Sequence, residues 1–222
     1  MEEHIVKILQ IEPVTHNVKR FRVERPENYQ FIPGQATEVA INTIQLRDER
    51  RPFTFTSLPG DPYLEFTIKI YDDHTGVTHE LGKLNPGDEL LLHDVWGAIS
   101  YKGKGIFIAG GAGITPFIAI FKDLYSRNDQ NGNLLIFANR TSEDIIMENE
   151  FTNMLGDHFL NILSEEKTVD YYYGFITQEF LKTSTAGYEK RFYVCGPPPM
   201  MDAVLKIIDD LGYSKDSVTI EL

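Results

Sequence analysis

Hydrophobic and polar residues follow two different patterns in the two halves of the chain. In the first hundred residues, short segments of alternating or β-rich character are separated by turns. These segments are HIVKILQIEP (4–13), VKRFRVERP (18–26), QATEVAINT (35–43), RPFTFTSLPG (51–60), YLEFTIKIYDD (63–73) and DELLLHDV (88–95). Their regular spacing predicts an antiparallel β-barrel or sandwich, interrupted by one helix near 77–84 that ends at the turn sequence NPGD.

From residue 101 onward, apolar strands alternate with amphipathic segments. The apolar runs are GIFIAG (105–110), NLLIFAN (133–139), FLNILSE (159–165) and RFYVCG (191–196), and the amphipathic segments lie near 116–127, 145–155, 177–183 and 199–211. This alternation predicts a doubly wound parallel sheet. Because 222 residues exceed the usual domain size of roughly 100 to 150, we predict an antiparallel β-barrel domain over 1–100 and an α/β domain over 101–222.

The composition narrows the classes of function. A formal charge of −12 argues against nucleic-acid binding, which relies on clustered Lys and Arg. No apolar run reaches the roughly 18 residues of a membrane helix, and MEEHIVKILQIEP lacks the basic and apolar regions of a signal peptide. We therefore expect a cytoplasmic protein with no membrane span, and a monomer.

Cysteine and histidine limit the metal chemistry that this chain supplies. Cys195 is the single cysteine, which excludes an intrachain disulfide and a cluster held by four thiolates from this chain. The six histidines show no metal-ligand spacing, and His74 and His79 are interpreted as surface residues. We predict no metal site. An iron–sulfur cluster that exchanged electrons with this chain would belong to a partner.

A glycine-rich turn, GGAGITPF (110–117), directly follows the first parallel strand. Thr115 is expected to cap the next helix, and Pro116 suits its first turn. Free N–H groups and the absence of Cβ atoms at Gly110, Gly111 and Gly113 would let a pyrophosphate approach. Because Pro116 stands where the GxGxxG pattern has its last glycine, an ordinary strand-to-helix turn is equally consistent with this segment.

A second turn, CGPPPMM (195–201), follows a later strand of the same sheet. The strand ends at Cys195 and Gly196, the prolines stiffen its exit, and a helix begins near Pro199. Ligands of doubly wound sheets bind beyond the carboxyl ends of the strands, where both turns lie. A lone cysteine is more typical of a small buried hydrophobic residue, and no His and acid partners support a nucleophilic role.

The segment RPFTFTS (51–57) combines several chemical groups along one strand. Arg51 can clamp a phosphate, and the ring of Phe53 can stack on a flat heterocycle. The hydroxyl groups of Thr54 and Ser57 can hydrogen-bond a ring nitrogen. The segment is also consistent with a plain strand that packs Phe53 and Phe55 on one face.

Taken in order, these segments resemble the ferredoxin reductase and flavodoxin reductase family of flavoproteins. RPFTFTS is similar to the family's RxYS flavin motif, and PGQ (33–35), TIKIYDD (67–73), GVT (76–78), the glycine turn and CGPPPMM match in the same order. The resemblance spans nearly the whole chain. It implies an FAD-binding domain followed by an NAD(P)H-binding domain, with FMN as the alternative flavin.

The residues and the resemblance together predict the site. By resemblance, Arg51 binds a flavin phosphate, Phe53 stacks on the isoalloxazine, and Thr54 hydrogen-bonds the flavin N5 region. The predicted cofactor-binding residues are Arg51, Pro52, Phe53, Thr54, Ser57, Lys69, Gly76, Val77 and Thr78 on the flavin side, and Gly111, Gly113, Thr115, Pro116, Arg140, Cys195, Gly196 and Pro197 on the nucleotide side. Thr54 and Cys195 are the predicted catalytic residues.

The chain departs from the family pattern at three places. Phe53 replaces the more usual Tyr, and DVWG (94–97) stands where relatives often have Gly-Pro. Trp96 either shapes the flavin pocket or fills the seam between the domains, and we favour the seam because a lone Trp usually packs. The last residues, TIEL, lack the aromatic that shields the flavin in several relatives, so the group that covers the flavin stays open.

The resemblance implies hydride transfer from NADPH or NADH to the flavin, followed by electron transfer to flavodoxin or ferredoxin. Arg140 can pair with a 2′-phosphate, which favours NADPH slightly, whereas Glu143 and Asp144 oppose additional negative charge. Two other functions stay open. One is a nucleotide-binding or electron-transfer subunit of a larger complex, and the other is a reductase of ferric chelates or free flavins.

An acidic acceptor would need a local basic patch, because the overall charge opposes its approach. The candidate patch residues are Arg47, Arg50, Lys102 and Lys104. Ordinary solvated surface charge is the simpler interpretation of each.

Overall fold

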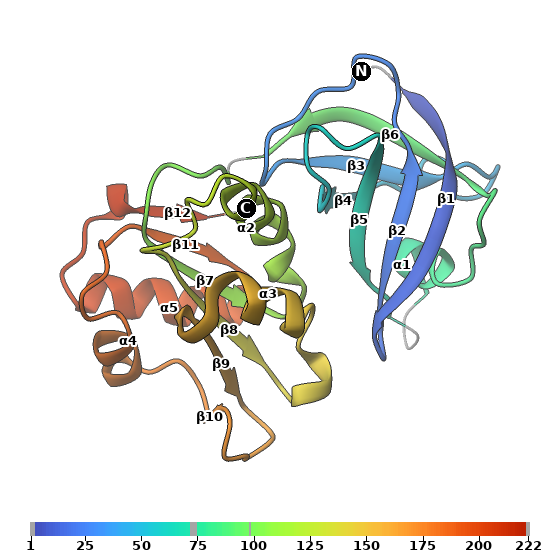
Figure 1. The fold of residues 1–222 in the computed structure, drawn as a ribbon. Helices are drawn as coiled ribbons and strands as arrows, with labels where there is room; N and C mark the ends of the chain where they lie inside the picture. Colours follow the sequence, from blue (N-terminus) through green and yellow to red (C-terminus); the bar gives the residue numbers. More distant parts are fainter. Residues whose placement is uncertain (1–2, 72–74, 98, 221–222) are drawn as a thin grey trace.

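The two halves of the chain form two separate β-sheets, one antiparallel and one parallel (Figure 1). The structure is a computed structural model that describes residues 3–71, 75–97 and 99–220. The predicted strand end at Asp72 and Asp73, together with His74 and the last two residues of TIEL, lies outside the described residues. The arrangement confirms the predicted fold class.

The first sheet has six antiparallel strands that close into a barrel. The strands are β1 (His4–Thr15), β2 (Val18–Glu24), β3 (Ala36–Ile41), β4 (Arg51–Thr54), β5 (Tyr63–Lys69) and β6 (Glu89–Trp96), in the order β4-β3-β6-β1-β2-β5. A single bridge between Phe55 and Phe66 joins the two end strands, and the Thr56 N–H donates to the Glu65 carbonyl at 2.7 Å beside it. Closure leaves few unpaired strand edges.

The barrel interior is filled by the inward-facing residues of these strands. Along β2, Phe21 and Val23 are buried in this core while Arg20 and Arg22 are partly exposed, as the alternating pattern predicts. Phe31 and Phe55 stack at 4.3 Å between ring centroids, and Phe55 also contacts Phe66 at 5.3 Å. The short helix α1 (Val77–Leu81) adds Val77 and Leu81 to this core. The core thereby fixes the path of the chain through β4.

The second sheet has six parallel strands between two layers of helices (Figure 1). Its strands are β7 (Ile106–Gly110), β8 (Leu134–Asn139), β9 (Phe159–Leu163), β10 (Tyr172–Tyr173), β11 (Phe192–Cys195) and β12 (Val218–Ile220), in the order β10-β9-β8-β7-β11-β12. The helices are α2 (Thr115–Ser126), α3 (Glu148–Leu155), α4 (Gln178–Ser184) and α5 (Pro198–Asp210). Residues of α2 and α3 pack on one face, and those of α4 and α5 on the other. Strands buried on both faces read as continuous apolar runs, as the sequence shows.

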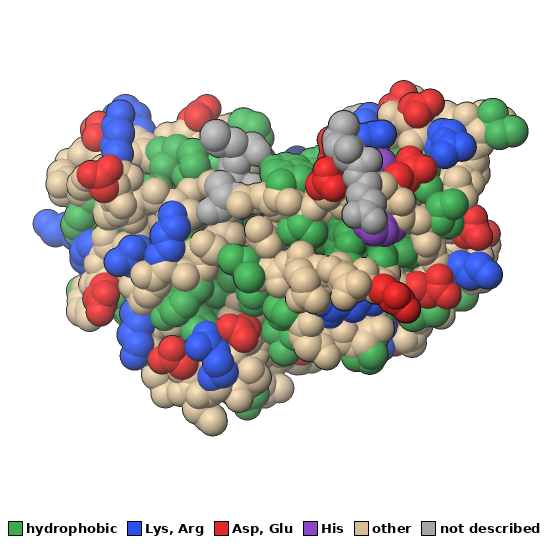
Figure 2. Space-filling model, turned by 90° about the horizontal axis from the view of Figure 1, so that it is seen from above, with side chains coloured by type: hydrophobic (Ala, Val, Ile, Leu, Met, Phe, Trp, Pro, Cys, Tyr) green, Lys and Arg blue, Asp and Glu red, His purple; other side chains and the backbone are tan. Residues whose placement is uncertain are grey.

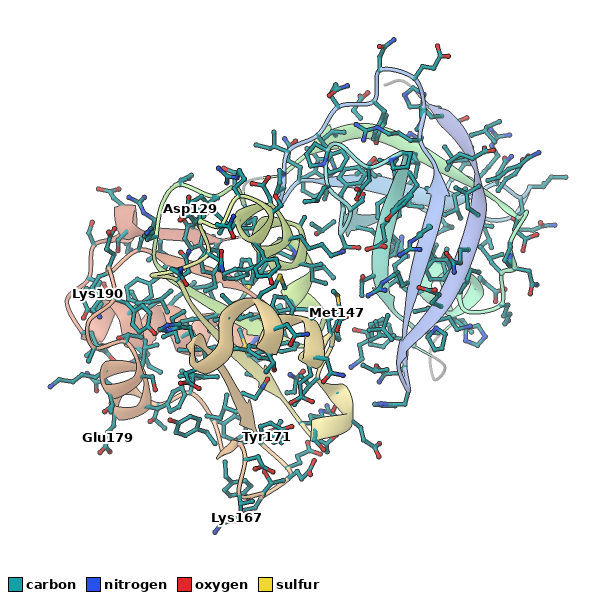
Figure 3. The ribbon with its side chains drawn as sticks, viewed as in Figure 1. Asp129, Met147, Lys167, Tyr171, Glu179 and Lys190 are labelled. Atoms are coloured by element: carbon teal, nitrogen blue, oxygen red, sulfur yellow. The ribbon has the colours of Figure 1, made fainter. Side chains whose placement is uncertain are left out.

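Two details differ from the sequence-based expectation. The helix predicted over 145–155 begins only at Glu148, because Met147 adopts a left-handed backbone with φ 55°. Figure 3 places Met147 on the side of this domain that faces the barrel. Strands β10 and β12 contain two and three residues, which is too short for a periodic pattern to reveal.

Glu65 of β5 holds the two domains together. Its side chain is 2% exposed and contacts Lys122 of α2 at 3.0 Å and Arg22 of β2 at 3.1 Å. Lys122 also donates to the Thr56 carbonyl at 2.8 Å, and the Thr56 hydroxyl donates to Glu65 at 3.1 Å. Burial alone would raise the pKa of the Glu65 carboxyl, but Lys122 and then Arg20 and Arg22 outweigh it and hold that pKa below 4.5. The carboxylate is therefore the ionised partner of three cations.

A second contact joins the β1–β2 turn to the parallel-sheet domain. The His16 ring lies 3.3 Å from the Glu143 carbonyl through Nδ1 and 3.8 Å from the Asp144 carboxylate through Nε2. Arg20 of β2 lies 3.6 Å from Glu150 of α3. Helix α2 and the β1–β2 turn thus bridge the domains at two separate points.

Within the described ranges, no helix combines the length and apolar character needed to cross a bilayer. Nor do three or more His, Cys, Asp or Glu side chains come together as metal ligands within residues 3–71, 75–97 and 99–220.

The substitution Glu65→Gln is expected to lower the free energy of unfolding by about 3 kcal/mol at pH 7, because it leaves three cations facing a neutral amide. The pKa of Glu65 is lowered, so its contribution is present above pH 4.5 and is lost as the pH falls through that lowered value. Urea unfolding followed by Trp96 fluorescence at pH 7 and in acid measures both effects. Glu12→Gln, at a more exposed carboxylate 3.6 Å from Arg20, serves as the control and should cost less than about 1 kcal/mol. An equal cost for both variants would contradict the assigned role.

Candidate functional site

Two cavities meet at the seam between the domains. The first, of about 250 Å³, is lined by Ala36, Pro52, Phe53, Thr54, Thr67, Ile68, Lys69, Tyr71, Thr78 and Trp96 from the barrel and by Ala112, Thr115 and Cys195 from the parallel-sheet domain. The second, of about 1060 Å³, extends over the carboxyl ends of the parallel strands. Figure 2 shows hydrophobic side chains exposed along the seam, whereas charged side chains of both signs are scattered over the two lobes. Lys69, Tyr71 and Ala112 line both cavities.

Strand β4 forms one wall of the first cavity. Phe53 is half-buried and Thr54 is 8% exposed, while the next residue, Phe55, turns into the barrel core. Both Phe53 and Thr54 line the cavity with Pro52. Among the described residues, the Thr54 hydroxyl has no hydrogen-bond partner within the protein. A ring and a free hydroxyl therefore face the same space.

Two predicted residues of the RPFTFTS segment lie elsewhere. Arg51 is exposed and lines neither cavity; its guanidinium donates to the Arg50 carbonyl at 2.6 Å and lies 3.6 Å from Glu49. Ser57 is 1% exposed, and its hydroxyl accepts the Glu65 N–H at 3.0 Å. The structure does not bring Ser57 to the cavity, because its hydroxyl supports the connection between β4 and β5.

The opposite side of the first cavity is formed by β5 and α1. Lys69 ends β5 and is half-buried, and no carboxylate of the described residues lies within ion-pair distance of its ammonium. Thr78 of α1 lines the cavity, and Gly76 precedes that helix. The Val77 side chain is 1% exposed in the barrel core, so its side chain does not face a ligand. Lys69 is the cation that both cavities share.

Trp96 lies in the wall of the first cavity, with 40% of its surface exposed. It pairs with Ala36 across β3 and β6. Trp96 therefore helps to shape the cavity, which is the alternative to the seam-filling role that we favoured from the sequence. A flat apolar ring is available there for contact with a ligand.

The glycine turn uses its three glycines in different ways. Gly111 has φ +51°, and a Cβ added there would meet nothing within 4 Å. A Cβ at Gly113 would lie 2.4 Å from the Cys195 carbonyl oxygen, and one at Gly110 would lie 2.4 Å from the Met200 sulfur. Only Gly111 leaves open space for a phosphate. Gly110 and Gly113 instead allow the turn to pack against β11 and α5, which corrects the expectation that all three make room for the ligand.

The first turn of α2 also differs in part from the expectation. Helix α2 begins at Thr115, with Ile114 as the preceding cap residue and no side-chain cap. The Thr115 hydroxyl instead donates to the Ala112 carbonyl at 3.0 Å, so the predicted cap is wrong. Pro116 occupies the first turn as predicted, and its side chain is buried rather than facing the cavity.

The turn after β11 brings Cys195 to the first cavity and Pro197 to the second. Cys195 is 8% exposed and belongs to the hydrophobic core beneath the sheet, so it also fits its description as a small buried residue. Gly196 packs against Gly110, because a Cβ there would lie 3.1 Å from the Gly110 nitrogen. Cys195 thus lies across the seam from Thr54.

The far part of the second cavity is lined by residues that follow β8, β9 and β10. Arg140 is exposed, and its guanidinium lies 3.6 Å from Glu165. Asp144 accepts hydrogen bonds from the backbone N–H and hydroxyl of Thr141, at 3.2 and 3.1 Å. This part of the cavity therefore carries carboxylates as well as one arginine.

Sequence reasoning missed several residues that line the second cavity, among them three that follow or end parallel strands. These are Asn139, Glu165 and Phe175. Asn139 ends β8, Glu165 follows β9, and Phe175 follows β10. Their position after strand ends is the signal that could have found the first two, since ligands bind at that edge of a doubly wound sheet. Phe175 follows a strand that the sequence did not predict.

The residues that line the two cavities fit a flavin in the first cavity and a nicotinamide nucleotide that lies beside it in the second. The first cavity offers two aromatic surfaces, Phe53 and Trp96, with the unpartnered hydroxyl of Thr54 between the apolar walls. Lys69 and the open space at Gly111 provide for phosphates. The second cavity is large enough for an elongated ligand that begins at the first.

Comparisons with known proteins agree with this geometry. The family description "Oxidoreductase FAD-binding domain" matches residues 5–101, and "Oxidoreductase NAD-binding domain" matches residues 107–206. The chain is 28% identical to NADH-cytochrome b5 reductase 2 of Mycosarcoma maydis over 94% of this chain and 69% of that protein. It is 26% identical to the reductase component of propane 2-monooxygenase from Rhodococcus jostii (strain RHA1), over 96% of this chain and 61% of that protein.

A solved structure has the same fold. A ferredoxin NADP⁺ reductase from Neisseria gonorrhoeae with bound FAD and NADP superposes with a TM-score of 0.84 and 20% identity, over 100% of this chain and 98% of that one. With both descriptions matched in order over most of the chain, the chain belongs to the oxidoreductases in which an FAD-binding domain precedes an NAD-binding domain, and it shares the fold of that ferredoxin NADP⁺ reductase.

Proposed function

We propose that this chain is an FAD-dependent reductase that oxidises NADH and passes electrons to a separate one-electron carrier protein. The observation that carries the proposal is the meeting of the two cavities at the seam, with Thr54 on the barrel wall and Cys195 on the opposite wall. The chemistry supplied by a bound FAD is acceptance of a hydride and release of electrons one at a time.

The protein's own residues position the reacting groups and keep water out. Phe53 and Trp96 provide flat apolar contacts, and Thr54 offers a hydrogen bond at the cavity centre. Cys195 is nearly buried, so it closes the nucleotide side without adding a charged group. Lys69, at the junction, places a positive charge beside phosphates of either ligand.

Charges at the far end of the second cavity favour NADH over NADPH. A 2′-phosphate there would meet the carboxylates of Glu165 and Asp144, and the single arginine, Arg140, is already 3.6 Å from Glu165. Acidic residues at this position in dinucleotide sites bind the ribose hydroxyls of NAD. The NADH named for the fungal relative supports the same choice. This proposal replaces the slight preference for NADPH that Arg140 suggests in the sequence.

The acceptor is proposed to be a small protein with its own redox group. With one cysteine in the sequence, this chain supplies no four-thiolate cluster of its own. Ferredoxin and flavodoxin remain the proposed acceptors from the sequence, and the relative's name adds cytochrome b5 as a comparator. The proposed basic patch is partly neutralised, because Arg47 lies 3.3 Å from Glu3 and Arg50 lies 3.7 Å from Glu38.

The proposed activity predicts a yellow protein whose flavin is bleached by NADH in an anaerobic stopped-flow experiment. Reoxidation is then followed with ferredoxin, flavodoxin, cytochrome b5, ferric chelates and free flavin. Fast one-electron reoxidation by one of the carrier proteins is the expected result. A colourless protein that binds NADH after reconstitution with FAD, or equal rates with all acceptors, would contradict a dedicated reductase.

Thr54→Val is expected to retain FAD and to slow flavin reduction by NADH about 10- to 100-fold, because it removes the β4 hydroxyl that faces the first cavity and has no partner among the described residues. Single-turnover absorbance at saturating NADH measures the step separately from binding. Thr152→Val, on an exposed position of α3, makes the same chemical change away from both cavities and should have no effect. A full reduction rate in the Thr54 variant would remove Thr54 from the mechanism.

Glu165→Gln is expected to lower the KM for NADPH about tenfold and to change the KM for NADH little, because it removes a carboxylate and releases Arg140 for a phosphate. Steady-state kinetics with both nucleotides measure the selectivity. Glu179→Gln, on α4 away from the seam (Figure 3), changes the charge equally and is the control. An unchanged ratio between the two nucleotides would show that Glu165 does not select NADH.

A further inference from the structure

A row of three side chains crosses the barrel wall at the first cavity. Ala36 of β3 pairs in register with Thr54 of β4 on one side and with Trp96 of β6 on the other. Residues that are directly opposite each other in antiparallel strands point to the same face of a sheet. All three side chains line the first cavity. The wall therefore presents a hydroxyl, a methyl group and an indole, in that order.

The exposed fraction differs along this row. Thr54 is 8% exposed and Ala36 is 1% exposed, whereas Trp96 is 40% exposed. The side chain of Ala36 is small, so the hydroxyl of Thr54 and the indole of Trp96 open onto the same space. Trp96 therefore stands at the end of the row where the cavity meets solvent.

The Trp96 end of the first cavity lies away from the junction with the second cavity. Among the described residues, Lys69, Tyr71 and Ala112 line both cavities, whereas Trp96 lines the first and not the second. A nucleotide in the second cavity would meet the flavin at that junction. An electron acceptor that arrives while the nucleotide is bound therefore has the Trp96 end as its approach.

The backbone holds the indole in the cavity wall. Trp96 is the last residue of β6, and the next residue, Gly97, has φ +135°. A Cβ added at Gly97 would lie 3.2 Å from the Gln35 Cα, so the chain here packs directly on the residue before β3. The Gln35 carbonyl in turn accepts the Phe55 N–H at 3.0 Å. Trp96 is thus a fixed part of the wall and not a side chain on a loose loop.

We infer that Trp96 is a specificity-determining residue for the electron acceptor, because its indole covers the solvent-side end of the bound flavin and keeps small acceptors from touching it. The inference rests on the proposed function, which places the flavin in the first cavity. A free flavin has to lie against the bound one to be reduced, at about 3 to 3.5 Å, and the indole occupies that approach. A carrier protein accepts electrons without direct contact between the two redox groups.

The two routes differ in how the electrons leave. Oxidation of one NADH releases two electrons and one proton. Two carrier molecules take one electron each and leave the proton in solution, whereas one free flavin takes both electrons together with that proton and a second one from solvent. A cover over the flavin therefore selects the first route by blocking the contact that the second route needs.

The first test measures how far solvent reaches the bound flavin. The FAD-loaded chain is titrated with iodide, and quenching of the flavin fluorescence is compared in wild type, Trp96→Ala, Trp96→Phe and Tyr125→Ala. Tyr125 of α2 is an aromatic residue of similar exposure, 47%, outside the lining of both cavities, and is the control. The iodide quenching constant is expected to rise several-fold in Trp96→Ala alone, because Trp96→Phe keeps a flat ring over the flavin.

The second test measures the acceptor directly. Each FAD-loaded protein is reduced anaerobically with one equivalent of dithionite and mixed with riboflavin in a stopped-flow instrument. Reoxidation by riboflavin is expected to be about tenfold faster in Trp96→Ala than in wild type. Trp96→Phe and Tyr125→Ala should stay within about twofold of the wild-type rate.

An unchanged quenching constant or an unchanged riboflavin rate in Trp96→Ala overturns the inference, as does an equal rise in Tyr125→Ala. Circular dichroism checks the fold, and Trp96→Val, which suits a strand position, replaces the alanine variant if that one does not fold. A wild-type chain that binds no FAD overturns the proposed function and this inference together. Bound FAD that NADH does not reduce overturns the proposed function alone, because neither measurement uses NADH.

Discussion

A buried carboxylate at the domain seam is the constraint on which the functional site depends. Glu65 is tolerated out of water only because Lys122 and two arginines surround it, and Lys122 belongs to the other domain. The pairing holds α2 against β5. Helix α2 begins at the glycine turn, and β5 ends at Lys69, so this contact sets the spacing between the phosphate turn and the barrel wall. The cavity is a consequence of how the two domains are joined.

Much of the fold could be predicted because its physics is local. Alternation along β2 and continuous apolar runs in β7 and β8 follow directly from burial on one or both faces. The motifs also placed the cavity, since Pro52, Phe53, Thr54, Lys69, Thr78 and Cys195 all line it. The segments that hold these residues each form a strand end or a turn at the seam. The sequence predicts the path of the backbone in such segments.

The roles of individual side chains were less predictable, because a motif marks the path of the backbone and not the direction of each side chain. Within one segment, Thr54 faces the cavity, Phe55 enters the barrel core, and Ser57 supports Glu65. Gly113 is needed for contact between two turns that lie 82 residues apart in sequence, which no local pattern reveals. The residues missed altogether, Asn139 and Glu165, depend on the lateral order of strands, and that order is a tertiary property.

The Thr54 hydroxyl and the Lys69 ammonium, in the walls of the first cavity, have no hydrogen-bond or ion-pair partner among the described residues, whereas both oxygens of the buried Glu65 carboxylate are engaged. An unpaired group is not sufficient evidence of function, because the His93 ring is 2% exposed with both nitrogens unpaired and lines neither cavity. The combination of an unpaired group with an open cavity is what separates a binding residue from a local imperfection of the core. The second cavity extends along the sheet from the turn after β11 past the end of β8, and it shares Lys69, Tyr71 and Ala112 with the first, so the barrel and the parallel sheet together enclose one continuous space.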